Sequence, residues 1–330
     1  MTDQQPLRYL SAADVAAAMP PLAERLELAE ITLRALGRCV ELPAKIGVHP
    51  RQPGSLAHAM PALLRGEASD GEADLIGVKW IAGFPENPAL GLPTYSALVI
   101  LNDARNGLPL AIMDAGAITA QRTAAISGVA IGLFAQNMGG RTAHVALIGA
   151  GVQARGHLPV IGRLLPGASV RITDVDRARA EALVGGARSV EGIGSAEVVS
   201  SVRRAVEGAD VVVSVVSFGL EHQALDPDWL GSDTLFVAVD YDMQAPATLA
   251  REAFFLVDER DQFLAARAAG GFAGYPDPSA TLGEARRDGP VRHAGRVLVS
   301  HLGMGLTDVV FASAILKRAE QLGLGVLLPR

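Results

Sequence analysis

The feature that most constrains the fold is a glycine-rich turn between an apolar strand and a helix. The strand candidate ends at Ile148, and a helix is predicted from Val152 to Leu165. The turn matches the GxGxxA pattern, in which the first glycine permits a tight turn, the second lets a diphosphate approach, and the alanine allows close helix packing. Its residues are Gly149, Ala150, Gly151, Val152, Gln153 and Ala154. The free N–H groups at the helix start favour an anion, so a dinucleotide-binding turn is predicted. Without a nucleotide, the same pattern is an ordinary strand, turn and helix.

An acidic residue at the end of the next strand candidate supports the dinucleotide interpretation. Asp174 follows the apolar segment from Ser169 to Thr173, about 20 residues beyond the turn, where a carboxylate accepts ribose hydroxyls. A carboxylate there repels a 2'-phosphate, which favours NAD. Arg177 and Arg179 leave NADP open as the alternative, because arginine accommodates that phosphate.

Strand and helix patterns divide the chain into two α/β parts. After residue 143, short apolar segments alternate with helical ones, which is typical of a Rossmann-type, doubly wound parallel sheet. The strand candidates there are His144–Ile148, Ser169–Thr173, Asp210–Val216, Thr234–Val239, Phe254–Val257 and Arg296–His301. The earlier part predicts a helical segment over residues 8–38 and then strands at Lys45–His49, Ala57–Pro61, Leu75–Ala82, Ser96–Asn102 and Pro109–Asp114. Long helices are predicted over Thr119–Gln136 and Thr307–Leu322.

Composition limits the classes of partner. The net charge of -6 and an aromatic content of 5% disfavour a nucleic-acid binder. The N-terminus lacks the pattern of a signal peptide, and no apolar run is long enough to span a membrane. The single cysteine, Cys39, together with the absence of Cys and His at metal-ligand spacing, predicts a reducing cytoplasm and no metal site.

Three further segments, together with the glycine turn, give the chain a family resemblance. They are Gly77-Val78-Lys79-Trp80, Phe84-Pro85-Glu86-Asn87 followed by Gly91-Leu92-Pro93-Thr94, Ile118 to Ala125, and the glycine turn with Gln153-Ala154. In this order and spacing the chain resembles the ornithine cyclodeaminase/mu-crystallin family. The resemblance implies a homodimer and hydride transfer between a nicotinamide and the α-carbon of an amino or imino acid. It also implies a substrate and dimerisation domain over residues 1–125, completed by 303–330, and an NAD-binding Rossmann domain over 126–302.

The resemblance also assigns residues to the substrate. An α-carboxylate needs convergent cations, and Arg122 can grip it with two hydrogen bonds while Lys79 supplies a compact second charge. The position of Lys45 usually carries an arginine in the family, so its role is less sharply implied. Asp240, after a predicted strand, matches the position that meets the substrate nitrogen, and Asp242 is the weaker competitor. Taken singly, Lys79 and Arg122 are also compatible with ordinary surface or salt-bridged residues.

One departure from the family concerns the substrate side chain. His58 stands two residues before Met60-Pro61, where ornithine-converting members carry a glutamate. A histidine donates to an acidic or neutral group, so the departure counts against ornithine. The leading hypothesis is therefore an NAD-dependent imino-acid reductase or amino-acid dehydrogenase acting on a small, preferably acidic, substrate. The alternatives are an ornithine cyclodeaminase-type cyclase and a non-catalytic, crystallin-like ligand-binding protein.

Overall fold

The computed structural model divides into two compact units. It describes residues 6–66, 73–135, 140–217, 222, 224–287 and 294–329. Unit 1 comprises residues 1–122 and 304–330, and unit 2 comprises 123–303. Unit 2 is thus an insertion into unit 1 along the chain, with helix α3 (Gly116–Phe134) carrying the chain from one to the other.

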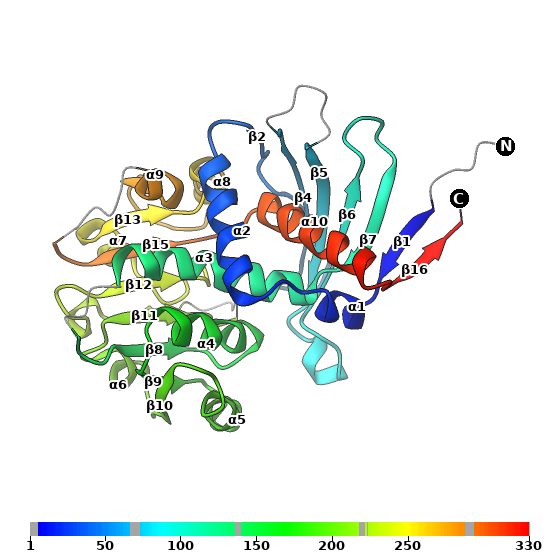
Figure 1. The fold of residues 1–330 in the computed structure, drawn as a ribbon. Coiled ribbons are helices and arrows are strands. Elements are labelled where there is room, and N and C mark those ends of the chain that lie inside the picture. Colours follow the sequence, from blue (N-terminus) through cyan, green and yellow to red (C-terminus); the bar gives the residue numbers. More distant parts are fainter. Residues whose placement is uncertain are drawn as a thin grey trace. The chain divides into compact units, whose positions relative to one another are not determined.

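Unit 1 is built on a mixed sheet with strand order β16-β1-β7-β6-β5-β4-β2, and β3 also pairs with β4. Its strands are β1 (Leu7–Leu10), β2 (Val40–Glu41), β3 (Ile46–Val48), β4 (Leu56–Leu64), β5 (Leu75–Gly83), β6 (Tyr95–Asn102), β7 (Pro109–Asp114) and β16 (Val326–Leu328). Its helices are α1 (Ala12–Ala17), α2 (Leu22–Ala35), the short η1 (Asn87–Leu90) and α10 (Gly305–Gln321). Figure 1 shows α10 lying across β4, β5 and β6.

The start of the chain differs from the helical prediction over residues 8–38. Leu7–Leu10 is a strand that pairs with both β7 and β16, because partners far along the chain satisfy its backbone. Helix α1 then begins after Ser11, whose side chain accepts from the Asp14 backbone N–H while Asp14 accepts in return. Pro20 and Pro21 separate this helix from α2.

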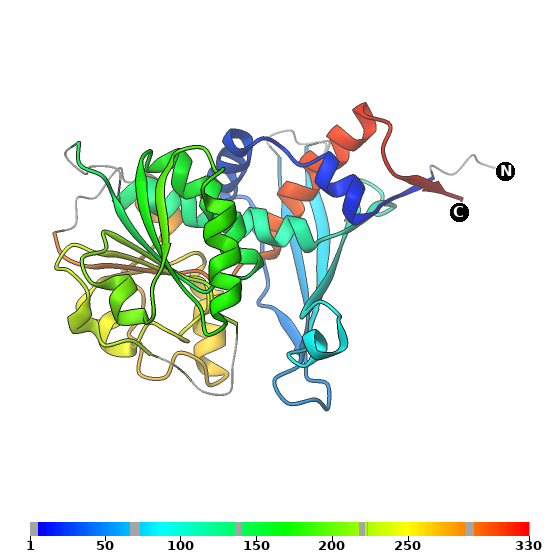
Figure 2. The same cartoon turned by 90° about the horizontal axis from the view of Figure 1, so that it is seen from below.

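Unit 2 has a wholly parallel sheet with strand order β10-β9-β8-β11-β12-β15-β13-β14, as a doubly wound fold requires. Its strands are β8 (His144–Ile148), β9 (Ala168–Thr173), β10 (Ile193–Val198), β11 (Val211–Ser214), β12 (Leu235–Ala238), β13 (Phe254–Val257), β14 (Ala280–Thr281) and β15 (Val297–Ser300). Its helical elements are α4 (Val152–Leu164), α5 (Arg177–Ala187), α6 (Val202–Val206), η2 (Pro227–Trp229), α7 (Ala247–Glu252), α8 (Arg260–Ala268) and α9 (Leu282–Arg287). Helices lie on both faces of this sheet (Figure 2).

The central strands of unit 2, β8, β11, β12, β13 and β15, are buried almost completely, which explains their continuous apolar sequences. Phe236 and Phe255 of the sheet join Val206, Leu249 and Phe263 of the helices α6, α7 and α8 in one hydrophobic cluster. This core holds the loops at the carboxyl ends of the strands, where the ligands of such sheets bind.

One described helix, α3, is long and apolar enough to cross a membrane by length and composition alone. The apolar 18-residue stretch within this helix is 67% buried inside the protein. We therefore interpret α3 as a core helix.

Candidate functional site

The predicted carboxylate-binding residues of unit 1 meet at one buried aspartate. Lys79 lies in the middle of β5 and is 1% exposed, and Arg122 lies on α3 and is 5% exposed. Lys79 Nζ is 3.2 Å and Arg122 Nε is 3.1 Å from the same atom, Asp308 Oδ1. Asp308 itself, in the first turn of α10, is 0% exposed. The cluster therefore holds two cationic groups and one carboxylate away from water.

Close packing of α10 on the sheet places Asp308 there. A Cβ at Gly305, the first residue of α10, would lie 2.3 Å from the backbone oxygen of Met60, so only glycine allows this approach. Met60 is the register partner of Lys79 across β4 and β5. The helix start is thereby held against β4, at the residue directly opposite Lys79.

Burial sets the protonation of Lys79. The loss of hydration lowers the pKa of its ammonium group to about 7, with Asp308 opposing this shift and Arg122 and Lys45 adding to it. Asp308 Oδ2 makes no hydrogen bond to any described residue, and Arg122 contacts Asp308 through Nε. A second anion, such as a substrate carboxylate, would favour the charged form of Lys79. It could bind the Nη groups of Arg122, which take no part in the contact with Asp308.

The two remaining predicted substrate residues are His58 and Lys45. His58 is opposite Gly47 in register and two residues from Met60, so it shares the face of Lys79. Burial lowers the pKa of His58, and the charges of Lys45 and His49 lower it further. His58 is therefore a neutral imidazole near neutral pH, and it would act on a substrate as a neutral donor. Lys45 is close enough to shift the pKa of both His58 and Lys79.

In unit 2, the glycine turn has the geometry that the motif predicts. Gly149 has a φ of +100°, and a Cβ there would lie 2.9 Å from the Val215 backbone oxygen. Gly151, the N-cap of α4, faces open space, and no side chain caps the helix. Ala154 is fully buried. The backbone N–H groups at the start of α4 can therefore receive a diphosphate, and the turn fits a dinucleotide.

Asp174 is attached to this turn. Its Oδ2 accepts from the Ala150 backbone N–H at 2.7 Å, and its Oδ1 accepts from the Asp176 backbone N–H at 2.8 Å. The two nearby arginines each contact another carboxylate, since Arg177 pairs with Glu181 and Arg179 with Asp176. The carboxylate rather than a free guanidinium therefore dominates the charge beside the turn.

Asp240 is the buried carboxyl group of unit 2. It follows β12, is 1% exposed, and its Oδ2 accepts from the Ser214 hydroxyl and, at 3.2 Å, from the Val216 backbone N–H. Burial raises its pKa to about 6, although both hydrogen bonds oppose this shift. Its Oδ1 has no partner among the described residues. Asp240 thus has one oxygen held in place, one available, and a pKa suited to proton transfer near neutrality.

The weaker competitor, Asp242, has a structural role. It accepts from the Phe272 backbone N–H at 2.9 Å and lies 3.8 Å from His222. Between the two aspartates, Tyr241 has a φ of +60°, which is unusual for a residue other than glycine.

Sequence reasoning missed Asp308 and Ser214 as members of the site. The sequence predicts only the helix and the strand that contain them, Thr307–Leu322 and Asp210–Val216. Two buried cations require a counter-ion, but the sequence alone does not show which carboxylate supplies it. Among the described residues, no group of three His, Cys, Asp or Glu is arranged to hold a metal.

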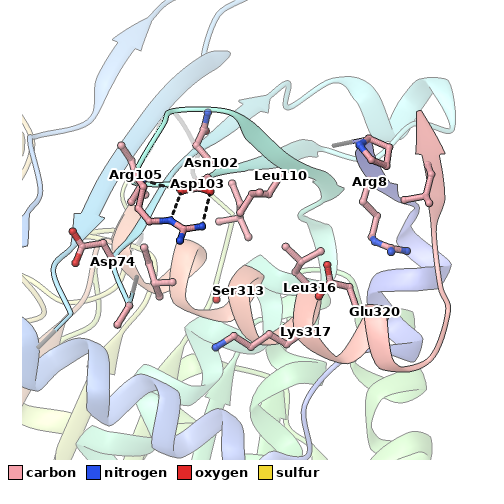
Figure 3. Close-up of a pocket in the computed structure, with 17 residues that line it drawn as sticks. Arg8, Asp74, Asn102, Asp103, Arg105, Leu110, Ser313, Leu316, Lys317 and Glu320 are labelled. Carbon is pink, nitrogen blue, oxygen red and sulfur yellow. Dashed lines mark hydrogen bonds and ion pairs between the residues drawn. The ribbon is translucent and has the colours of Figure 1, made fainter. Parts of the chain in front are cut away.

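A separate hollow of about 630 Å³ lies in unit 1, beside the C-terminal half of α10 (Figure 3). It contains none of the predicted site residues. Charges of both signs line it, and Figure 3 shows Asp103 and Arg105 paired at its edge. The charged lining residues are Arg8, Asp74, Asp103, Arg105, Lys317 and Glu320. This balance favours neither an anion nor a cation.

Comparison with known proteins identifies the family. The model of the ornithine cyclodeaminase/mu-crystallin family matches residues 10–322. Nodulation efficiency protein NfeD of Rhizobium meliloti is 35% identical over 329 residues, covering 98% of both chains. An archaeal alanine dehydrogenase dimer with bound NAD is 26% identical, with a TM-score of 0.80 and coverage of 98% of this chain and 99% of that one.

A third comparison concerns the fold alone. The Δ1-pyrroline-2-carboxylate reductase of Thermococcus litoralis, solved with NADH and L-proline, has a TM-score of 0.84 at 22% identity, covering 98% of this chain and all of that one. With the family model matching nearly the whole sequence, the chain belongs to the ornithine cyclodeaminase/mu-crystallin family.

Proposed function

We propose that this protein is an NAD-dependent oxidoreductase that transfers hydride between the nicotinamide and the α-carbon of a small imino or amino acid. The observation that carries the proposal is the buried cluster of Lys79, Arg122 and Asp308. Two buried cations with one shared anion form a site for one further negative charge. An amino or imino acid brings that charge as its α-carboxylate.

Unit 1 supplies the substrate contacts in this proposal. Arg122 binds the carboxylate with its terminal nitrogens, and Lys79 becomes fully charged as the carboxylate raises its pKa from about 7. Lys45 adds long-range attraction, and His58 meets the distal end of the side chain as a neutral donor. Carboxylate binding near neutral pH is therefore coupled to proton uptake by Lys79.

Asp240 handles the proton at the substrate nitrogen. Its unpartnered Oδ1 accepts from the iminium or ammonium group, while Ser214 and Val216 keep the carboxyl group in one orientation. A pKa of about 6 lets the group hold or release a proton within the working range.

Unit 2 binds the cofactor through the turn from Gly149 to Ala154, with Val152 and Gln153 in the first turn of α4. When bound, the cofactor supplies or accepts the hydride at C4 of its nicotinamide. Asp174 favours NAD, because its carboxylate is bonded to the turn and the nearby Arg177 and Arg179 each pair with another carboxylate. The alanine dehydrogenase structure contains NAD, which supports this choice.

A spectrophotometric screen tests the function. Purified protein is supplied with NADH or NADPH and with 2-oxo acids plus ammonia or methylamine, or with a preformed cyclic imino acid. We expect NADH oxidation that depends on both the oxo acid and the amine. No oxidation with any of these substrates, despite measurable NADH binding, would refute the proposed reaction and favour a non-catalytic ligand-binding protein. Conversion of ornithine to proline without net cofactor reduction would instead establish a cyclodeaminase.

A homodimer in the cytoplasm is the assembly and location we propose. The sheet face of unit 1 opposite Lys79 carries partly exposed apolar side chains, with Ile76 37%, Trp80 45% and Leu98 40% exposed. The structure of the archaeal alanine dehydrogenase is a dimer, which supports pairing of this chain. Trp80→Glu should convert the dimer to a monomer in sedimentation velocity, whereas the exposed Val175→Glu should not. A dimer that is unchanged by Trp80→Glu would contradict this face as the interface.

A further inference from the structure

A buried serine joins two histidines inside unit 2. Ser127 Oγ lies 2.8 Å from His157 Nε2 and 2.8 Å from His301 Nε2. His157 Nδ1 lies 2.7 Å from the Gln153 backbone oxygen. The three side chains are 0% to 1% exposed, so water cannot replace these contacts.

The direction of each hydrogen bond in this network follows from the chemistry of the Gln153 carbonyl and the two histidines. A carbonyl oxygen only accepts, so His157 must carry its proton on Nδ1 to donate to Gln153. Burial lowers the pKa of His157 to about 4, so its Nε2 carries no proton and accepts from Ser127. The serine oxygen then accepts from His301, which carries its proton on Nε2. One arrangement of protons therefore satisfies all three contacts.

This hydrogen-bond network connects the proposed cofactor-binding turn with the segment that precedes Asp240. At one end is Gln153, in the first turn of α4 that follows the glycine turn. At the other end, the His301 backbone N–H donates to the Ala238 oxygen at 3.1 Å, two residues before Asp240. The next two residues, Leu302 and Gly303, donate to the buried Asp258 at 3.2 and 2.8 Å. His301 is therefore a fixed support on which α4 is held through Ser127.

We propose that Ser127 is a positioning residue that holds the first turn of α4, and with it the diphosphate-binding N–H groups, in place through His157. The inference rests on the proposed dinucleotide site. Ser127 touches neither substrate nor cofactor in this account. It acts through the two histidines, by donating to His157 and accepting from His301.

Ser127→Ala removes the shared partner of both Nε2 atoms and leaves His157 with an unsatisfied acceptor in a dry interior. We expect the dissociation constant of NADH, measured by fluorescence titration without substrate, to rise roughly tenfold, in line with the loss of a buried hydrogen-bond network. The KM for NADH should rise similarly, while kcat at saturating NADH changes much less. Ser127→Thr keeps the hydroxyl and should restore most of the affinity.

Ser300→Ala is the matched control. Ser300 is also 0% exposed in unit 2, but its hydroxyl has no hydrogen-bond partner among the described residues. Its removal should leave NADH affinity within about twofold of wild type. An equal loss of NADH affinity in Ser300→Ala and Ser127→Ala would overturn the proposal, because the loss of any buried hydroxyl would then explain the weaker binding.

Nitrogen-15 NMR of the histidine-labelled full chain gives a second readout that does not depend on catalysis. We expect His157 as the Nδ1–H tautomer in both the wild type and Ser127→Ala, because the Gln153 oxygen fixes it. We expect His301 as the Nε2–H tautomer in the wild type, with this assignment lost in Ser127→Ala. The opposite tautomers, or an unchanged NADH affinity in Ser127→Ala, would overturn the inference. A wild-type protein that binds NADH but reduces no imine would overturn the proposed function alone.

Discussion

The replacement Arg122→Leu tests the carboxylate site most directly. Arg122 is 5% exposed and contacts Asp308 through Nε, so its terminal nitrogens can form two parallel hydrogen bonds to a substrate carboxylate. A charge-assisted hydrogen bond contributes about 1.5 to 3 kcal/mol, and two together about 3 to 6 kcal/mol. Each 1.4 kcal/mol is about tenfold, so kcat/KM for the imino acid should fall by about 10²- to 10⁴-fold.

The matched control for this variant is Arg122→Lys, which keeps the charge but loses the planar fork. It should retain part of the activity and fall by about 10- to 100-fold, the loss of one hydrogen bond. NADH binding should stay close to wild type in both variants, because the diphosphate contacts belong to the turn at Gly149. Circular dichroism and thermal unfolding check the fold, since Asp308 keeps Lys79 as its remaining ion-pair partner. Wild-type kcat/KM in Arg122→Leu would refute the carboxylate clamp, as would loss of NADH binding with the substrate KM unchanged.

Three further predictions follow from the other site residues. Asp174→Ser should raise kcat/KM for NADPH relative to NADH by removing the charge beside the ribose, and an unchanged cofactor ratio would contradict that role. The pKa of Asp240 is raised from 3.8 to about 6, so the folded protein binds more protons than the unfolded chain between these values and loses stability as pH rises through them. Asp240→Asn should therefore abolish activity yet increase the free energy of unfolding by about 3 kcal/mol at about pH 7.5, with little gain at about pH 4, in urea titrations. The wild-type chain should form little proline from ornithine. His58→Glu should weaken the binding of acidic substrates by charge repulsion and raise their KM. Equal KM values for an acidic substrate in both proteins would show that His58 does not contact the substrate.

Elements with strong local patterns were predictable from sequence. The strands β7, β8 and β13 have their predicted bounds, and the long helix α3 begins three residues before its predicted start at Thr119. The predicted end of that helix, Gln136, lies outside the described residues. Elements that depend on distant partners were not predictable: β1 was assigned to a helix, and β10 was not identified because Ile193–Val198 contains Gly194, Ser195 and Glu197.

The same distinction holds for the site. Lys79, Arg122, Asp174 and Asp240 could be predicted as candidates because local motifs and a family resemblance mark them. Asp308 is 229 residues from Lys79 along the chain, so only the packing of α10 on β5 brings them together. Ser214 and Asp240 likewise meet because β11 and β12 are neighbours in the sheet. Long-range pairing of this kind has no signature in a single sequence.

The two glycines of the phosphate turn answer to different constraints. Gly149 is required by the protein's own packing, because a side chain there would collide with the backbone at Val215. A Cβ added at Gly151 would have no heavy atom within 4 Å, so the fold itself tolerates a larger residue there. Only a bound dinucleotide would clash with that side chain. A descendant that had abandoned its cofactor would keep the first glycine and become free to vary the second. The residue at position 151 should therefore distinguish relatives that still bind the nucleotide, which keep glycine, from relatives that retain only the fold.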